Sequence, residues 1–143
     1  MSTEQHLKLY RKAMHCMDNA AKMLSEKGKE KDGLYQNIKC VRVACGAAYS
    51  GLLLATKCFL EMKGKPLVRK KGRQLTITQY EENLAQADSK ALDHFNNAYT
   101  LLCLDGYCDG LNSAAALKAG FESAMEIFKR IAPRGVSHSK KLN

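Results

Sequence analysis

The sequence contains no tryptophan and only two prolines among its 143 residues, and it has no prominent clusters of β-branched residues. Proline interrupts helices and β-branched residues favour strands, so the scarcity of both predicts a protein dominated by helices. With 45% hydrophobic and 26% charged residues, the chain has enough apolar material for one core. We therefore predict an all-α fold with a single domain over residues 1–133, followed by a basic, flexible tail over residues 134–143.

Long uncharged runs are also missing. The opening residues MSTEQHLKLYRK lack the apolar core of a signal peptide. The uncharged run between Arg42 and Lys57 covers 14 residues, whereas about 20 apolar residues are needed to cross a bilayer. We therefore expect a cytoplasmic protein that does not span a membrane.

The six cysteines include no Cys-x-x-Cys motif. Cys40 and Cys45, like Cys103 and Cys108, are five positions apart, and neither pair has a histidine at the spacing of a zinc site. Without a secretory signal, free thiols that pack as small hydrophobic residues are the favoured interpretation, and we expect no metal or cofactor. A reactive pair formed on folding between His94 and Cys103 or Cys45 stays open, although nothing in the sequence singles it out.

Apolar residues that recur every three or four positions predict four helices. The first begins with a capping box at Ser2 and Gln5 and ends near residue 27. The second is one long central helix over about residues 34–63, which ends at Gly64 with Pro66 just beyond. At ~1.5 Å per residue it would be about 45 Å long, enough to serve as the spine of a bundle.

The second half of the chain predicts two more helices. One begins near residue 76 with Thr78 and Glu81 as its capping box, and the sequence ADSK at 87–90 leaves open whether this helix is continuous. After a turn that contains Gly106 and Gly110, the last helix begins at residue 112 or 113 and ends before Pro133. Together these patterns predict an antiparallel, up-and-down four-helix bundle.

Small residues crowd into the central helix. Glycine costs up to ~1 kcal/mol relative to alanine inside a helix, so its presence there indicates that other helices come close. We predict tight helix packing at five positions: Ala44, Ala47, Ala48, Gly51 and Ala55.

The formal net charge of +9 is distributed unevenly. Residues 63–75 hold six lysines and arginines and no acid, while residues 76–112 hold six acids and one lysine. A basic loop beside an acidic helix leaves four interpretations open. The loop is a solvated connection, it contacts an anion or nucleic acid, it binds an acidic protein partner, or the two charged surfaces meet in a dimer. The candidate contact residues are Lys63, Lys65, Arg69, Lys70, Lys71 and Arg73.

Two stretches carry a resemblance to known proteins. The run IKCVRVACGAAYSGLLLATKCFLEMKGKP contains an Ala-Cys-Gly-x-Ala-Tyr core, and the later run from QYEENL to EIFKRI contains a Gly-Tyr-x-Asp-Gly turn. From about residue 34 to residue 131 the chain resembles a small family of uncharacterised bacterial helical proteins without an assigned function. More distantly, the order of its helices is similar to HEPN-type four-helix bundles, which include RNA-cutting toxins and noncatalytic dimeric modules.

The HEPN resemblance implies no catalytic residues for this chain. Ribonucleases of that type use an Arg and a His separated by four to six residues near the start of a late helix, and the matching segment DGLNSAAALKAGF contains neither. We therefore predict a noncatalytic interaction or accessory module that forms a homodimer. The alternative is a HEPN-like nucleotide- or RNA-binding protein that uses the basic loop over residues 63–73.

Overall fold

Helices make up most of residues 2–131, the part of the chain that a computed structural model describes. This content confirms the predicted all-α class. The predicted flexible tail at 134–143 lies outside the described residues. The elements are α1 (Thr3–Lys27), β1 (Glu30–Lys31), β2 (Leu34–Tyr35), α2 (Ile38–Met62), α3 (Ile77–Ala87), α4 (Ser89–Ala98), the π-helix η1 (Tyr99–Cys108) and α5 (Ala114–Ile131).

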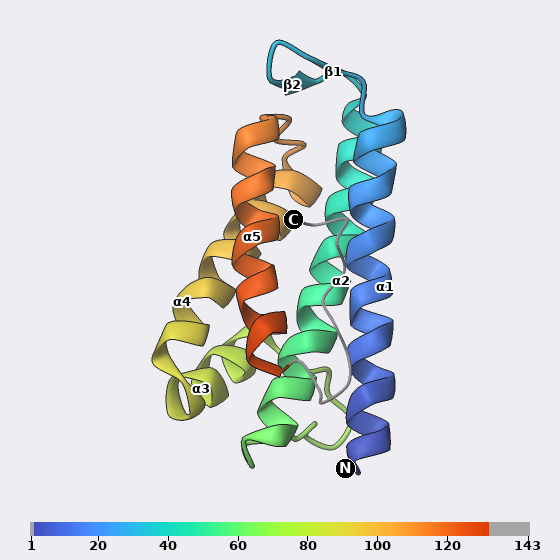
Figure 1. Cartoon of the computed structure of the whole chain (residues 1–143). Helices are drawn as coiled ribbons and strands as arrows, with labels where there is room; N and C mark the ends of the chain where they lie inside the picture. Colours follow the sequence, from blue (N-terminus) through green and yellow to red (C-terminus); the bar gives the residue numbers. More distant parts are fainter. Residues whose placement is uncertain (1, 132–143) are drawn as a thin grey trace.

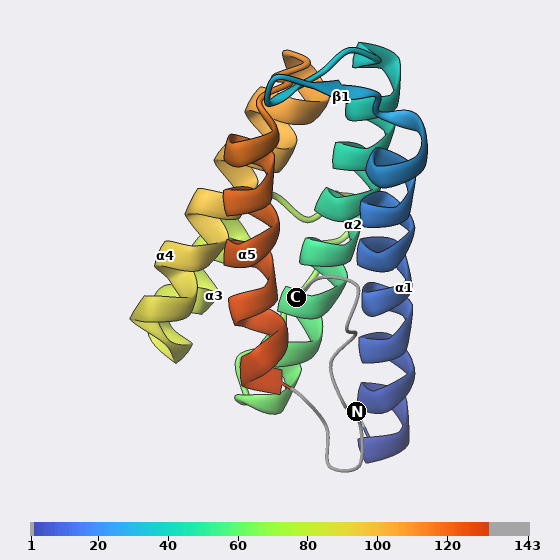
Figure 2. The same ribbon diagram turned by 45° about the horizontal axis from the view of Figure 1, so that its top comes forward.

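The first two long helices, α1 and α2, lie antiparallel and side by side (Figures 1 and 2). The predicted capping box at the start of α1 is confirmed, since the Ser2 hydroxyl accepts from the Gln5 amide and the Gln5 side chain accepts from the Ser2 amide. On α2, Gly51 faces α1 so closely that a Cβ there would lie 3.0 Å from the Ala13 carbonyl oxygen. The two backbones therefore approach each other where the central helix lacks a side chain.

The predicted start of the central helix at residue 34 was wrong, because α2 begins at Ile38. The preceding residues pair as a short antiparallel hairpin, β1 with β2. Asp32 and Gly33 both have positive φ, 54° and 82°, as in the Asp-Gly turns that connect such hairpins. Asn37 then caps α2 by accepting a hydrogen bond from the Cys40 amide.

In place of the predicted third helix, the chain forms three consecutive helical pieces, so residues 2–131 hold five α-helices and η1 instead of four helices. The chain breaks at Asp88, whose extended backbone ends α3 and whose carboxylate caps α4 by accepting from the Lys90 and Ala91 amides. The capping box of α3 was also predicted at the wrong residues: Thr76 and Gln79 form it.

The predicted turn around Gly106 was wrong as well, since Gly106 lies inside the π-helix η1. A Cβ on Gly106 would lie 2.5 Å from the Cys45 sulfur, so the missing side chain lets η1 pack directly against α2. Gly110, with φ of 69°, follows the end of η1 and redirects the chain toward α5.

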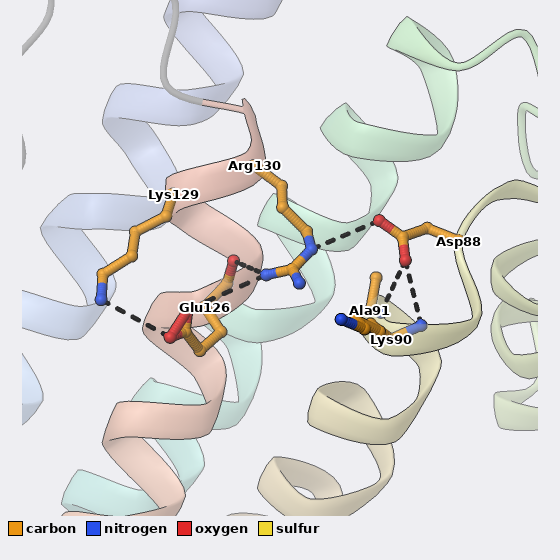
Figure 3. A network of polar contacts seen from close by, with 6 residues as sticks. All are labelled: Asp88, Lys90, Ala91, Glu126, Lys129 and Arg130. Atoms are coloured by element: carbon orange, nitrogen blue, oxygen red, sulfur yellow. Dashed lines mark hydrogen bonds and ion pairs between the residues drawn. The ribbon is translucent and has the colours of Figure 1, made fainter.

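The helix α2 lies at the centre of the fold, between α1 and the layer formed by η1 and α5 (Figure 1). Two side-chain contacts connect α5 to α1 and to the junction of α3 and α4. The Tyr10 ring of α1 meets the Phe128 ring of α5 edge-on at 5.9 Å between centroids. In the same last turn of α5, Arg130 donates from Nε to Asp88 Oδ2 at 3.3 Å and so connects α5 to the junction of α3 and α4 (Figure 3).

Candidate functional site

Nothing in residues 2–131 resembles an assembled metal site, since no three His, Cys, Asp or Glu side chains in that range gather closely enough. Cys103, one of the two thiols considered as a partner for His94, has Tyr49 and Cys108 as neighbours, and both affect its pKa. Burial raises the pKa of the Cys45 thiol to about 12, so this thiol is not ionised at neutral pH.

One face of α2 is left uncovered by the other helices. It consists of positions three or four apart that are exposed or half-buried, and it is bordered on one side by the exposed Arg42 and the half-buried Tyr49. We call this surface the open face; its residues are Lys39, Val43, Gly46, Ala47, Ser50, Leu53, Leu54, Lys57 and Glu61.

The open face has no charge over its middle stretch. Lys39 lies at one end and Lys57 and Glu61 lie at the other, and the residues between them are small or apolar, with Val43 51% exposed. By length and composition α2 could cross a membrane, yet 56% of its most apolar window of 18 residues is buried within the fold. Such burial is what the core helix of a helical bundle has, but the uncovered remainder of that window is unusually apolar for a surface.

The neighbouring helices flank the open face with further apolar groups. Tyr107 of η1 is 51% exposed, and its ring lies beside Gly46, where a Cβ would be 3.0 Å away. On the other side, Leu9, Cys16 and Met23 repeat every seven residues along α1 and are half-buried. The uncharged surface therefore extends beyond α2 itself.

The five predicted packing positions are divided between the core and the open face. Ala44, Ala48, Gly51 and Ala55 are buried. Ala47 is half-buried and belongs to the open face.

The basic loop joins α2 to α3, and all six of its predicted contact residues are exposed. The loop backbone is attached to α3: the Asn83 amide donates to the carbonyls of Lys65 and Pro66, and the Gln79 amide donates to the Val68 carbonyl. Within the described residues the ion pairs involve Lys129 and Arg130 of α5. The loop thus presents cations to solvent on a fixed backbone.

A pocket of about 670 Å³ opens where α1, the hairpin and the start of α5 meet. No pattern in the sequence predicts this pocket, because the residues that line it come from α1, the hairpin and α5, which are distant in the chain. Its charged lining mixes both signs, so it does not select for cations or anions: Glu26, Lys29, Glu30, Lys118 and Glu122.

Three polar side chains on α2 and η1 influence one another: Tyr49, Cys103 and Cys108. Burial raises the pKa of Cys103, the neighbouring Cys108 raises it further, and the Tyr49 hydroxyl opposes both effects. Cys103 is half-buried, whereas Cys108 is exposed to solvent. The sequence shows the spacing of the two cysteines but not the π-helix in which both lie.

Comparisons with known proteins identify a family without an assigned activity. The model of the family described as domain of unknown function DUF5618 matches residues 8–133. A solved structure of a protein of unknown function from Dyadobacter fermentans is 31% identical, with a TM-score of 0.79 over 92% of this chain and 97% of that one. The search of curated proteins found no match. The chain therefore belongs to the DUF5618 family, and its fold is shared by a second protein of unknown function.

Proposed function

We propose that this protein is a noncatalytic helical interaction module that forms a homodimer through the open face of α2. The observation that supports the proposal is the uncharged middle of that face, which the fold leaves uncovered although α2 is its central helix. Exposed apolar surface of this kind is typical of protein contact sites. The module is proposed to act in the cytoplasm without a bound metal or cofactor.

A second copy of the chain fits this face in one orientation. In a two-fold contact, residue i of one copy meets residue j of the other and the reverse also holds. An antiparallel pairing of two α2 helices centred on Ser50 places Leu53 against Ala47 of the partner copy and Leu54 against Gly46. Large side chains would then fill the space left by small ones, as interdigitated helix packing requires.

The charges at the two ends of the open face agree with the same orientation. With Ser50 at the centre, Lys39 of one copy lies opposite Glu61 of the other, twice in each dimer. A parallel pairing would instead place Lys39 beside Lys39 and Glu61 beside Glu61. Opposite charges across a contact favour one register and disfavour the other, so the antiparallel arrangement is the one we propose.

The first test is the mass of the protein in solution. We expect light scattering during size-exclusion chromatography to give twice the chain mass of 15.9 kDa. Ser50→Lys should give a monomer, because two added ammonium groups would meet at the two-fold axis in an apolar setting. Ala119→Lys adds the same charge at an exposed position of α5 and should remain a dimer. A wild-type monomer at micromolar concentration, or a dimeric Ser50→Lys variant, would reject the proposal.

The second test concerns the register. Lys39→Glu and Glu61→Lys should each weaken the dimer, since each places like charges opposite one another. The double variant should recover most of the loss, because it restores the pair in reverse. Exposed ion pairs contribute only about 0.2 to 1 kcal/mol, so the change should be a few-fold in the dimer dissociation constant, measured by sedimentation. A double variant weaker than both single variants would contradict this register.

A second candidate function uses the basic loop. Its exposed cations, presented on a backbone fixed by Asn83 and Gln79, favour contact with nucleotide or RNA phosphates, in line with the HEPN resemblance. Binding should weaken steeply as salt rises, and the double variant Lys70→Glu with Lys71→Glu should reduce it. Failure of the wild-type chain to retard any RNA or DNA at low salt would remove this candidate.

A further inference from the structure

The pocket between α1, the hairpin and the start of α5 shares no residue with the open face. Its volume of about 670 Å³ lies within the range of about 300 to 1,000 Å³ that is usual for small-molecule sites. The buried side chains among its lining residues are all apolar: Leu24, Leu117 and Phe121. A ligand that fills this pocket therefore needs an apolar body.

Hydrogen bonds hold the hairpin wall of the pocket against α5. The Tyr35 amide donates to the Asn112 carbonyl, and the Asn112 side-chain amide donates to the Tyr35 carbonyl. Beside them the Ala114 amide donates to the Gly33 carbonyl. The Tyr35 ring packs so closely over Gly28 that a Cβ there would lie 2.6 Å from it. The pocket is thus formed without a ligand, which lowers the entropy cost of binding one.

The rim of the pocket carries charges of both signs on each side. Glu26, Lys29 and Glu30 come from α1 and the hairpin, and Lys118 and Glu122 come from α5. All five are exposed, and none of them belongs to an ion pair within residues 2–131. A ligand with a single charge would meet both attraction and repulsion on each side. A zwitterion can instead pair its ammonium with a glutamate and its carboxylate with a lysine.

Lys29 has a backbone conformation that favours glycine. It follows the C-cap Gly28 of α1 with φ of 55°, and glycine is the usual residue at this position after a helix. The lysine therefore adds backbone strain that glycine would avoid, and it supplies an ammonium group to the rim of the pocket. Strained residues of this kind are typical of ligand-binding sites.

We propose that this pocket binds a small zwitterion with an apolar body, of the class of apolar amino acids and their short peptides. The apolar body packs on Leu24, Leu117 and Phe121, while the two charged ends pair with opposite charges on the rim. Burial raises the pKa of Tyr35 and the charge of Glu30 raises it further, so the Tyr35 hydroxyl stays protonated and can donate to the ligand carboxylate. Because no lining residue belongs to α2, the proposal does not depend on the homodimer.

The test is calorimetric titration of the full chain with L-phenylalanine and, separately, with the dipeptide phenylalanyl-leucine. We expect at least one of the two to bind, and the one that binds shows whether the site takes an amino acid or a peptide. The matched controls are the N-acetylated form, which lacks the ammonium, and the amidated form, which lacks the carboxylate. Each should bind a few-fold more weakly than the zwitterion. No binding of either zwitterion at millimolar concentration, or equal affinity for the capped forms, would overturn the proposal.

Two variants test the site itself. Lys29→Gly should be at least as stable to urea as the wild type, because glycine adopts a φ of 55° without strain, yet it should bind the zwitterion a few-fold more weakly. Lys31→Gln removes the same charge from a nearby exposed residue that does not line the pocket, and should bind like the wild type. Ala21→Leu should abolish binding, because it fills the pocket from α1. Wild-type affinity in either Lys29→Gly or Ala21→Leu would reject this pocket as the zwitterion site.

Discussion

The two covered sides of α2 are packed in different ways. On the α1 side, small residues and thiols make the contact: Gly51 touches the α1 backbone, and the thiols of Cys40 and Cys58 donate to the carbonyls of Met23 and His6. On the other side aromatic rings predominate, and they form a series of contacts at 5.9 to 6.3 Å between centroids. That series runs through Tyr80, Phe95, Tyr99 and Tyr49.

The two sides are also covered differently: α1 alone covers one side, whereas α5 and the three consecutive pieces α3, α4 and η1 contact the other. Small side chains let two straight helices lie close together over their full length, as α1 and α2 do (Figure 2). Bulky rings hold the backbones further apart. The chain on that side bends at Asp88 and widens into η1, where Gly106 again brings it against α2. A close approach on either side therefore depends on a glycine.

The largest effect should come from filling the contact between α1 and α2. Gly51→Leu would force a side chain against the Ala13 carbonyl, Cys16 and Met17, all within 3.1 Å of a new Cβ. Because the nearest atom belongs to the backbone, the strain cannot be relieved by a rotamer change, and we expect a loss of about 3 kcal/mol or more in the free energy of unfolding. Urea denaturation monitored by circular dichroism measures it.

Ser50→Leu is the matched control for Gly51→Leu. It adds the same side chain one residue away, on the open face, where the described part of the chain leaves room. Because Ser50 lies at the centre of the proposed dimer contact, both variants are compared at protein concentrations at which the homodimer is dissociated. The free energy of unfolding of the monomer should then change by less than about 0.5 kcal/mol in Ser50→Leu, as at most surface positions. Equal losses in the two variants would show that α1 does not approach Gly51 more closely than it approaches the open face.

A smaller effect should follow from the corresponding change on the other side of α2. In Gly106→Ala the new methyl group would meet the Cys45 sulfur and the Leu101 carbonyl, which should cost about 1 to 3 kcal/mol by overpacking. In a Cys45→Ala background the sulfur is absent, so the added cost of Gly106→Ala should fall. Denaturation of the four chains as a double-mutant cycle measures the coupling. Additive losses would mean that Gly106 and Cys45 are not in contact.

The sequence predicts the helices on one side of α2 better than those on the other. The side covered by α1 follows from local rules. The capping box at Ser2 and the apolar repeats of two long helices predict α1 and most of α2 correctly. The start of α2 was misplaced because the pattern continued into residues 34–37, which the Asp32-Gly33 turn recruits into a hairpin instead.

The side of α2 covered by α3, α4 and η1 depends on contacts between residues that are distant in the sequence. ADSK pointed to the break at Asp88, but its link to Arg130 on α5 is not a local signal. The sequence predicts a turn where η1 lies, because Gly106 and Gly110 are typical of turns. In the structure Gly106 instead lets η1 contact Cys45, which lies 61 positions earlier in the chain. The sequence predicts the open face only in part. Its small residues stand out in the sequence, but which of them remain uncovered depends on where α1 and η1 lie.

The smallest effect should come from the junction that bends the chain. Asp88→Ala removes the cap of α4 and the contact with Arg130 (Figure 3). Loss of a helix cap costs about 0.5 to 2 kcal/mol, and the partly exposed ion pair adds less than about 1 kcal/mol. Asp93→Ala, at an exposed position on the same helix, is the control and should be nearly neutral.

The same junction predicts a dependence on pH. Burial alone would raise the pKa of Asp88, but hydrogen bonds from the Ala91 and Lys90 amides and the charge of Arg130 outweigh it, so the pKa of Asp88 is lowered on folding. A carboxylate with a lowered pKa stabilises the fold above its unfolded pKa, and this stabilisation is lost as the pH falls through the folded value. Asp88→Asn keeps a cap without the charge, so the wild type should be more stable than this variant at pH 7 and should lose that advantage below about pH 4. A difference that stays constant from pH 7 to pH 3 in urea midpoints would show that the charge of Asp88 does not contribute to the bend.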